Sequence, residues 1–334
     1  MKKSFGFNKE GKEVSLYTLE NEKIRMSVMD YGATLVSFVD KETGIDLVEG
    51  FDCVEDYMKQ DTYIGASIGR TANRIKDGTF SLNGKTYHCP VNNGPNCNHG
   101  GMEGFDKKLW HAVEEEDSVT FRYTSIDGEE GYPGNLFVKV VYQLKENGIS
   151  IVSEGRSDQD TLFAYTNHSY FNLDESENAM DHGLKIYGDQ YALSDQDGLT
   201  LDEVVSVKNT PFDFTEWKLV GKDINEDNQQ LRFGAGYDHH YPIKGQGLRD
   251  MAILKGKKVT LTMRSDFPWF HLYTANWLPG WKGKRGHNYP KRSAVCLEAE
   301  YMPNAINYPD QVQPVVHAGE ILKHEIQFLI SHEK

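Results

Sequence analysis

A nine-residue polar and aromatic stretch at positions 165–173 holds His168, the first candidate for a side chain that exchanges protons with a ligand. It reads Tyr-Thr-Asn-His-Ser-Tyr-Phe-Asn-Leu and closes a strand-like run. In an extended chain successive side chains alternate between faces, so Thr166, His168 and Tyr170 share one side. The ordinary pKa of histidine, about 6.5, suits proton transfer near neutral pH. A lone histidine is more often a structural group with satisfied hydrogen bonds, so His168 needs chemical partners elsewhere in the chain.

A pair of carboxylates in the run Val-Cys-Leu-Glu-Ala-Glu at positions 295–300 is the second candidate. As a strand, this run places Cys296, Glu298 and Glu300 on one face. Burial or a neighbouring like charge raises the pKa of a glutamate toward neutrality, which suits a general base. The alternative is an ordinary half-exposed strand. Because Tyr-Met-Pro at 301–303 ends the run, we expect Glu298 to lie deeper in the sheet than Glu300.

Two polar motifs in the first third of the chain supply hydrogen-bonding groups. Gly-Arg-Thr-Ala-Asn-Arg-Ile at 69–75 brings together two guanidinium groups and an amide, which suit a ligand with several oxygens. Arginines on surface loops are common, so this motif is weak evidence alone. The turn-rich segment 92–104 contains His99 among glycines that allow close approach to a ligand or another chain segment.

Gly-Tyr-Asp-His-His at 236–240 has the composition of a metal-binding cluster. In a strand, however, His239 and His240 point to opposite faces, and no further ligand stands at helical spacing. We therefore expect no metal site here. Asp238, as an acceptor for ligand hydroxyls, is the better functional interpretation.

Strands must position these groups, because short alternating apolar runs dominate the chain. The sequence has 31 Gly, 18 Tyr and 16 Phe, a composition that favours strands and turns over helical bundles. A short surface helix is predicted at 52–59, and Asn83-Gly84 within 78–88 predicts a tight type I′ hairpin. Residues 176–236 read as irregular. We predict strands at 14–19, 24–29, 33–39, 119–124, 136–144, 149–154, 258–264, 269–274, 294–298 and 320–329.

Length and charge bound the class of protein. The 334 residues show no repeat or linker, so we predict one all-β domain over 1–334. A net charge of −14 argues against nucleic-acid and anionic membrane partners and favours a neutral ligand. No apolar run is long enough to span a bilayer, so we expect a soluble, cytoplasmic protein. The cysteines form no C-x-x-C pair, so we expect reduced thiols and no structural zinc at Cys53, Cys89, Cys97 and Cys296.

Together the motifs resemble the aldose 1-epimerase family, also called galactose mutarotases. The resemblance runs nearly end to end and rests on the motifs at 69–75, 98–101, 104–107, 127–134, 166–173, 236–239 and 296–298, which stand in family order. One such motif is weak evidence, whereas the whole set is specific. The resemblance implies a large antiparallel β-sandwich with few short helices. It also implies interconversion of the α and β anomers of free aldohexoses, such as galactose and glucose, without a cofactor or metal.

The resemblance also implies catalytic roles, position by position. Glu298 would take the proton from the anomeric hydroxyl, and His168 would protonate the ring oxygen as the ring opens. His99 would assist near the same oxygen. We expect His168 and Glu298 on opposite sides of one sugar-sized cleft.

Four other positions would hold the sugar hydroxyls by the same resemblance: Asn73, Arg74, Asp238 and His271. Arg70, in the same motif as Arg74, is assigned a structural role. At His271 members of the family often have Gln, which leaves that contact and the preference for glucose or galactose open.

Three other functions remain open from the sequence. A sugar-phosphate epimerase would need a basic phosphate pocket, and a non-catalytic carbohydrate-binding protein would need neither His168 nor Glu298. A metal-dependent hydrolase would lose activity with a chelator. The expected partner is a monosaccharide, and the expected assembly is a monomer or a weak homodimer.

Overall fold

Strands form the framework of the computed structural model, which describes residues 1–332. The broadest sheet in this part of the chain has nine strands, and its pairings are antiparallel. In spatial order they are β10 (His111–Glu114), β11 (Ser118–Ser125), β12 (Leu136–Lys145), β13 (Gly148–Ser157), β29 (Ile321–His332), β23 (Val259–Ser265), β22 (Arg249–Lys255), β17 (Gly183–Ile186) and β20 (Lys218–Leu219).

Two four-stranded antiparallel sheets accompany the broad one. The first contains β1 (Lys2–Phe7), β2 (Glu13–Glu20), β3 (Ile24–Met29) and β4 (Thr34–Asp40). The second, in the order β16-β27-β24-β21, contains β16 (Tyr170–Phe171), β27 (Val295–Glu300), β24 (Trp269–Tyr273) and β21 (Asp238–Pro242). Shorter strands pair as β5 (Ser67–Ile68) with β15 (Thr166–Asn167), β6 (Arg74–Ile75) with β9 (Cys97–Asn98), β7 (Thr79–Leu82) with β8 (Lys85–His88), β14 (Thr161–Leu162) with β28 (Val315–Val316), β18 (Gln190–Ser194) with β19 (Thr200–Ser206), and β25 (Trp281–Lys282) with β26 (Asn288–Tyr289).

β12 shows how the sequence builds the core. Its residues alternate between buried and more exposed positions, and Leu136, Val138, Val140, Tyr142 and Leu144 belong to the main hydrophobic cluster. Each fully buried Val or Leu side chain contributes about 1.5–3 kcal/mol, so the alternation decides which face of the sheet turns inward.

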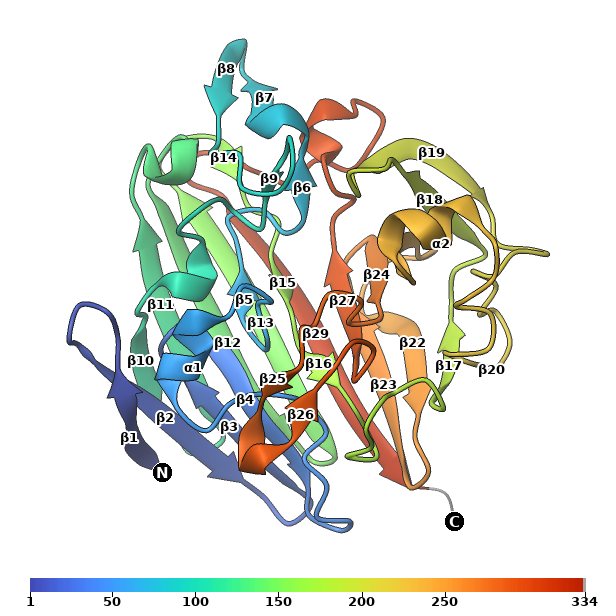
Figure 1. Ribbon diagram of the computed structural model, residues 1–334. Helices are drawn as coiled ribbons and strands as arrows, with labels where there is room; N and C mark the ends of the chain where they lie inside the picture. Colours follow the sequence, from blue (N-terminus) through green and yellow to red (C-terminus); the bar gives the residue numbers. More distant parts are fainter. Residues whose placement is uncertain (333–334) are drawn as a thin grey trace.

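The sheet β16-β27-β24-β21 lies across the broad sheet (Figure 1). Phe171 of β16 packs against Phe328 of β29, with ring centroids 4.8 Å apart. Val295 and Leu297 of β27 belong to the same core. Because side chains alternate along a strand, the opposite face of β27 carries Glu298 and its neighbours two positions away, and the whole strand is buried. The second face of this small sheet is where the candidate site forms.

The all-β prediction is confirmed, and most predicted elements are present. Both α-helices of the described chain, α1 (Val54–Lys59) and α2 (Gln229–Gly234), have six residues, and α1 lies within the predicted segment 52–59. The hairpin β7–β8 is also confirmed. Its turn residues Asn83 and Gly84 have φ values of 52° and 75°, as a type I′ turn requires.

The segment 176–236 is more regular than predicted. It supplies β17 and β20 to the edge of the broad sheet, and it contains the pair β18–β19 and helix α2. Strands of two to four residues are too short to show alternation, which is why the sequence pattern missed β17 and β20. Strands β1 and β22 were not predicted either.

Within residues 1–332, every helix is too short or too polar to cross a bilayer. The main hydrophobic cluster joins residues from β2 to β29. That residues 1–334 form a single domain stays a prediction.

Candidate active site

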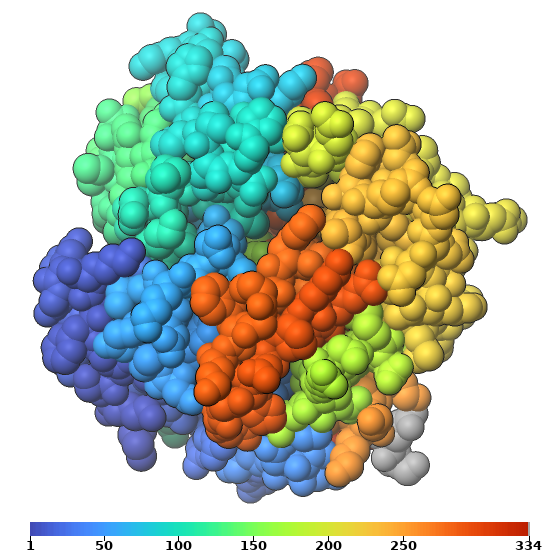
Figure 2. All heavy atoms as spheres, in the orientation of Figure 1, coloured from blue at the N-terminus to red at the C-terminus, as the bar shows by residue number. Residues whose placement is uncertain are grey.

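One pocket gathers six of the seven predicted site residues. It has a volume of about 260 Å³ and opens on the face shown in Figure 2, where the cyan segment before residue 100 approaches the orange segment near residue 277. Concave polar hollows of this kind bind small molecules. The six residues are Asn73, Arg74, His99, His168, Asp238 and His271.

His168 enters the pocket from the link between β15 and β16. Its backbone N–H donates to the carbonyl of Ala66 at 2.9 Å, and its carbonyl accepts from the N–H of Gly65 at 2.8 Å. The ring stacks between two phenols: the Tyr170 ring lies 5.2 Å away at 13°, and the Tyr63 ring lies 6.1 Å away at 19°. The stacking confirms that His168 and Tyr170 share a face, and it fixes the plane of the imidazole.

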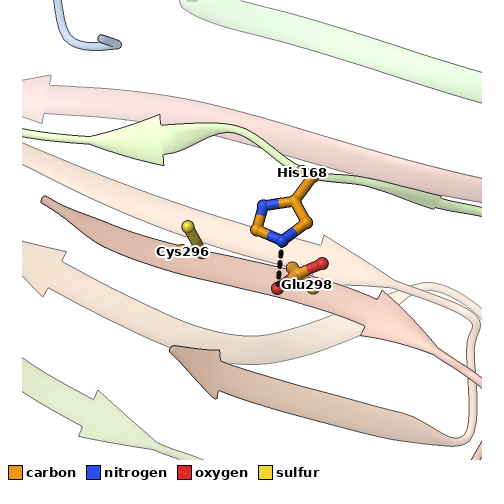
Figure 3. A group of neighbouring side chains, drawn as sticks. All are labelled: His168, Cys296 and Glu298. Carbon is orange, nitrogen blue, oxygen red and sulfur yellow. Dashed lines mark ion pairs between the residues drawn. The ribbon is translucent and has the colours of Figure 1, made fainter. Parts of the chain in front are cut away.

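Glu298, the seventh predicted residue, reaches His168 from the neighbouring strand (Figure 3). Tyr170 pairs with Cys296 across β16 and β27, which brings the side chain two residues further along β27 close to His168. His168 Nε2 lies 3.8 Å from Glu298 Oε1. The prediction that the two groups face each other across a cleft is wrong. They lie side by side because adjacent segments carry them, with His168 in the pocket wall and Glu298 buried behind it.

The two groups have pKa values shifted in opposite directions. Burial and the charge on His271 lower the pKa of His168 to about 4. Burial, with the carboxylates of Glu300 and Asp238, raises the pKa of Glu298 to about 8 against an opposing effect of His271. Between these values the pair holds one proton, on Glu298, and one free acceptor, on His168. Such a pair can give one proton and take another in the same step.

His99 and Asn73 hold each other in place. Both have left-handed backbones, with φ values of 50° and 59°. The His99 N–H donates to the Asn73 carbonyl at 3.1 Å, and the Asn73 N–H donates to His99 Nδ1 at 3.2 Å. Burial and the nearby His168 lower the pKa of His99 well below its usual range. His99 is therefore a neutral ring whose proton resides on Nε2, available as a donor.

The glycine-rich loop docks closely on the motif at 69–75. A Cβ added to Gly100, where φ is 87°, would lie 2.0 Å from the carbonyl oxygen of Gly69. Only glycine fits such a contact in this conformation. The close approach predicted for these glycines is confirmed, and its partner is another segment of the chain.

The two arginines of that motif have different environments. Arg70 is 2% exposed, and its guanidinium donates to the Ser125 hydroxyl and to the carbonyls of Pro133 and Gly134. Arg74 lines the pocket, where its Nε donates to Asn93 Oδ1 at 3.0 Å. Arg70 thus ties down the loop at 127–134, as its predicted structural role requires, and Arg74 faces the ligand space.

A buried network of two histidines and two carboxylates lies beside the pocket. His271 Nε2 donates to Asp238 Oδ1 at 2.8 Å, and His271 Nδ1 lies 3.4 Å from Glu300 Oε1. Glu300 Oε1 also lies 2.6 Å from His240 Nε2, and His240 Nδ1 lies 3.0 Å from Thr200 Oγ1. Strand register assembles the network, since His240 pairs with His271 across β21 and β24.

The charges in this network compensate one another. Burial would raise the pKa of Glu300, but hydrogen bonds with His240 and His271 outweigh it and lower that pKa to about 2. Burial would lower the pKa of His271, but Asp238 and Glu300 outweigh it and raise that pKa to about 10. His271 is therefore an imidazolium at neutral pH. As predicted, Glu298 lies deeper in the sheet than Glu300, which is the last residue of β27, although each is 1% exposed.

Adjacent strands also bring together donor atoms that can hold a metal ion. His239 points away from His240, toward the rings of Tyr191 and Phe212, as predicted. The sequence pattern considered only helical spacing and therefore missed ligands supplied across strands. The absence of a metal site stays a prediction. Among residues 1–332, two sets have donor atoms within 4.8 Å of one another: His168 with Cys296 and Glu298 (Figure 3), and His240 with His271 and Glu300.

Sequence reasoning missed part of the pocket wall. Tyr63 packs against His99 with ring centroids 4.5 Å apart and the rings tilted by 55°, and Trp277 lines the pocket while 63% exposed. Trp277 stands in a loop after β24, where an exposed aromatic side chain is the available signal for ligand contact. The other residues of the wall that were not predicted as site residues are Asp61, Thr62, Asn93, Asn98, Tyr170 and Tyr273.

The comparison with known families agrees with this geometry. Residues 15–329 match the family model described as Aldose 1-epimerase. The chain belongs to the aldose 1-epimerase family. Over 327 residues it is 36% identical to a galactose mutarotase from Bos taurus, which covers 95% of this chain and 94% of that relative. Over 311 residues it is 35% identical to an aldose 1-epimerase from Haemophilus influenzae, which covers 90% of each chain.

Solved structures of the aldose 1-epimerase family have the same fold. A galactose 1-epimerase from Lactobacillus acidophilus superposes with a TM-score of 0.89 at 27% identity, covering 100% of this chain and 99% of that chain. An aldose epimerase homologue from C. elegans superposes with a TM-score of 0.89 at 28% identity, covering 96% of this chain and 100% of that chain. The antiparallel β-sandwich expected from the resemblance is confirmed.

Proposed function

We propose that this member of the aldose 1-epimerase family is an isomerase that interconverts the α and β anomers of free aldohexoses such as galactose and glucose. The observation that carries the proposal is the proton-exchanging pair, in which His168 lines the pocket and its Nε2 lies 3.8 Å from Oε1 of the buried Glu298. Family membership over nearly the whole chain supports the same activity.

Ring opening of an aldose requires two proton transfers. One proton leaves the hydroxyl on C1 and one arrives at the ring oxygen, after which rotation about C1–C2 and closure on the opposite face complete the change. Both oxygens are bonded to C1. An acid and a base that lie side by side can therefore serve both at once, which is the arrangement of His168 and Glu298.

In the proposed assignment Glu298 takes the proton from the anomeric hydroxyl and His168 protonates the ring oxygen. His99 donates from Nε2 near the same oxygen. Because the pKa of Glu298 is higher than that of His168, the proton shared by the resting pair lies on Glu298. That state suits the reverse assignment, in which Glu298 is the acid and His168 is the base. Both assignments need one proton on the pair, so they share one pH dependence. Because the reaction runs both ways, each group takes both roles.

The sugar hydroxyls are assigned to Asn73, Arg74, Asp238 and His271, which line the pocket. Arg74 donates only and a carboxylate such as Asp238 accepts only, so together they suit neighbouring hydroxyls that do both. His271 is the weakest of the four assignments, because both of its ring nitrogens already face carboxylates.

Polarimetry of freshly dissolved α-D-galactose and α-D-glucose tests the activity. The protein should accelerate the approach to anomeric equilibrium at a rate proportional to its concentration. The control is Glu298→Gln protein at the same concentration and in the same buffer, which corrects for catalysis by buffer ions. An approach no faster than in buffer alone contradicts the proposal.

A sugar-phosphate epimerase is the second candidate, and the charge of the pocket disfavours it. Among the described lining residues Arg74 is the one Lys or Arg side chain, and it is accompanied by Asp61 and Asp238. Two carboxylates against one guanidinium and the His271 imidazolium leave no net positive charge for a phosphate dianion. Initial rates on galactose and on galactose 6-phosphate separate the two functions. Full activity in the presence of a chelator separates the proposal from a metal-dependent hydrolase.

The proposal includes a monosaccharide partner, a location in the cytoplasm, and a monomer or weak homodimer. The net charge of −14 supports the exclusion of nucleic acid and anionic membranes. The free thiols at all four cysteines of the described chain support a reducing compartment. Light scattering on the purified protein tests the assembly.

A further inference from the structure

His271 and Glu300 carry charges that the proposed proton transfer does not use. They are 4% and 1% exposed, and His271 Nδ1 lies 3.4 Å from Glu300 Oε1. The same nitrogen lies 3.8 Å from Glu298 Oε1. Unpaired charges at such burial would be strongly destabilising, so the two require each other. Their position also places a charge of each sign next to the proton-exchanging pair.

We propose that His271 and Glu300 are matched positioning residues, a buried ion pair whose opposite charges balance each other's effect on Glu298 and His168. The pair thereby sets the pH range in which the reaction runs. The inference rests on the proposed function and deepens it. It gives Glu300 a role, and it gives His271 a role beyond contact with a sugar hydroxyl.

Three carboxylates surround His271 and favour its charged form. Nε2 donates to Asp238 Oδ1 at 2.8 Å. Nδ1 lies 3.4 Å from Glu300 Oε1 and 3.8 Å from Glu298 Oε1, and the Asn73 amide nitrogen lies 3.2 Å from the same ring nitrogen. Negative charge on both sides of the ring stabilises the imidazolium over the neutral form. His240 Nε2 lies 2.6 Å from Glu300 Oε1, the same oxygen that faces His271.

The groups that face this site come from several elements. Those that carry or can gain a charge are Asp238 and His240 on β21, Glu298 and Glu300 on β27, His168 before β16, and Arg74 and His99 on the two motif loops. Three more acids interact with Glu298 and stay neutral because burial raises the pKa of each: Tyr170, Tyr273 and Cys296. Within this set, the charges of His271 and Glu300 can each be removed by a single substitution.

The two charges act on the proton-exchanging pair in opposite directions. The positive charge of His271 lowers the pKa of both Glu298 and His168, and the negative charge of Glu300 raises both. A charge within about 4–6 Å shifts a pKa by about 1–3 units. His271→Gln should therefore move both limbs of the kcat/KM pH profile to higher pH by about one unit or more. Glu300→Gln should move both limbs to lower pH.

The test is a set of pH profiles by polarimetry on the full chain. The variants are His271→Gln, Glu300→Gln and the double variant, with wild type as reference. The single variants should shift in opposite directions, and the double variant should return close to wild type. Structural damage alone would not produce shifts of opposite sign that cancel. Unmoved limbs, or shifts in the same direction, overturn the inference.

A matched control is available at a distant buried histidine. His182 is fully buried and lies 3.9 Å from Asp174, outside the pocket wall. His182→Gln should leave both limbs in place. If Glu300→Gln does not fold, His271→Gln alone tests the inference, because both limbs of its pH profile must move to higher pH. Thermal melts establish which variants are folded.

A readout independent of activity separates this inference from the proposed function. In wild type, nuclear magnetic resonance of the ring nitrogens should show His271 as an imidazolium through neutral pH. A neutral His271 ring overturns the inference even if the protein is an active epimerase. An inactive wild type with a charged His271 overturns the proposed function and leaves the ion pair without a catalytic role.

Discussion

Glu298 and Glu300 lie two residues apart on one face of β27 and are equally buried, yet their surroundings differ. Glu300 Oε1 lies 2.6 Å from His240 Nε2 and 3.4 Å from His271 Nδ1. Glu298 Oε1 lies 3.8 Å from His168 and His271 and has no hydrogen-bond partner among residues 1–332. The pKa of Glu300 is lowered to about 2, whereas that of Glu298 is raised to about 8.

The contrast shows that burial alone does not decide the chemistry of a carboxyl group. Glu300 is paired, so it is a permanent charge that holds neighbours in place. Glu298 is buried without a partner, an arrangement that costs stability and leaves the group ready for a ligand. Environments that push the pKa values of neighbouring acids apart are typical of acid–base catalysis.

The largest expected effect is on turnover. Glu298→Gln and His168→Asn should each lower kcat by a factor of about 10²–10⁴, because neither replacement can exchange the proton. Polarimetric rates measure the loss, and circular dichroism checks that the variants fold. Near-normal turnover in either variant would remove that residue from the mechanism.

The second effect is on stability, where substitutions of Glu300 and of Glu298 should change the free energy of unfolding differently. Glu300→Gln breaks a buried ion network and should lower the free energy of unfolding by about 3–5 kcal/mol at neutral pH. Glu298→Gln breaks no such pair and should leave that free energy unchanged or raise it by about 1 kcal/mol. Urea unfolding of both variants measures the difference. Equal losses would contradict the comparison.

The sign of the pH dependence follows from the same shifts. The pKa of Glu298 rises on folding from 4.5, so its contribution to stability is full below about pH 4.5 and is lost as pH rises through about 8. The pKa of Glu300 falls on folding from 4.5, so its contribution is present above about pH 4.5 and is lost as pH falls toward 2. The loss in free energy of unfolding caused by Glu300→Gln should therefore become smaller at acidic pH.

The third effect is the pH profile of wild-type kcat/KM. Activity should fall below about pH 4, where His168 takes a second proton onto the pair, and above about pH 8, where Glu298 loses the only one. Each limb should approach a tenfold change per pH unit. A rate that stays flat both below about pH 4 and above about pH 8 is the outcome that refutes the one-proton pair.

The smallest effect concerns Asp238. Asp238→Asn removes a charged acceptor from the proposed sugar site and should raise KM about tenfold, as loss of a charge-assisted hydrogen bond does. It also removes one of the two carboxylates that hold His271. Steady-state kinetics across pH separate the two roles of Asp238. Loss of a sugar contact changes KM, whereas disruption of the ion network shifts the limbs of the pH profile. A variant with unchanged KM and unchanged limbs would exclude both.

Local sequence predicted the faces of strands but not their register. Alternation in 295–300 correctly grouped Glu298 with Glu300, and the motif in 165–173 correctly grouped His168 with Tyr170. The distance between His168 and Glu298 depends on the pairing of β16 with β27, which no local pattern encodes. The same limit hid the network around His271, because its members lie on three strands that are distant in sequence.

The loops show the opposite limit. Glycines in 92–104 predicted a close approach, and Gly100 makes one against Gly69. The sequence did not indicate that Tyr63 and Trp277 would complete the wall, since their loops lack a repeating pattern. Loop conformation depends on the contacts that a folded scaffold offers, so the sequence identifies flexible positions more readily than their neighbours.

The place of β29 has a consequence for how the protein is made. It follows every other strand of the described chain, yet it lies between β13 and β23 in the middle of the broad sheet. During synthesis the two halves of that sheet must wait, with open edges, until residues 321–332 leave the ribosome. Open strand edges pair readily with other chains. Completion of the broad sheet therefore depends on whether β29 inserts before a neighbouring chain pairs with those edges.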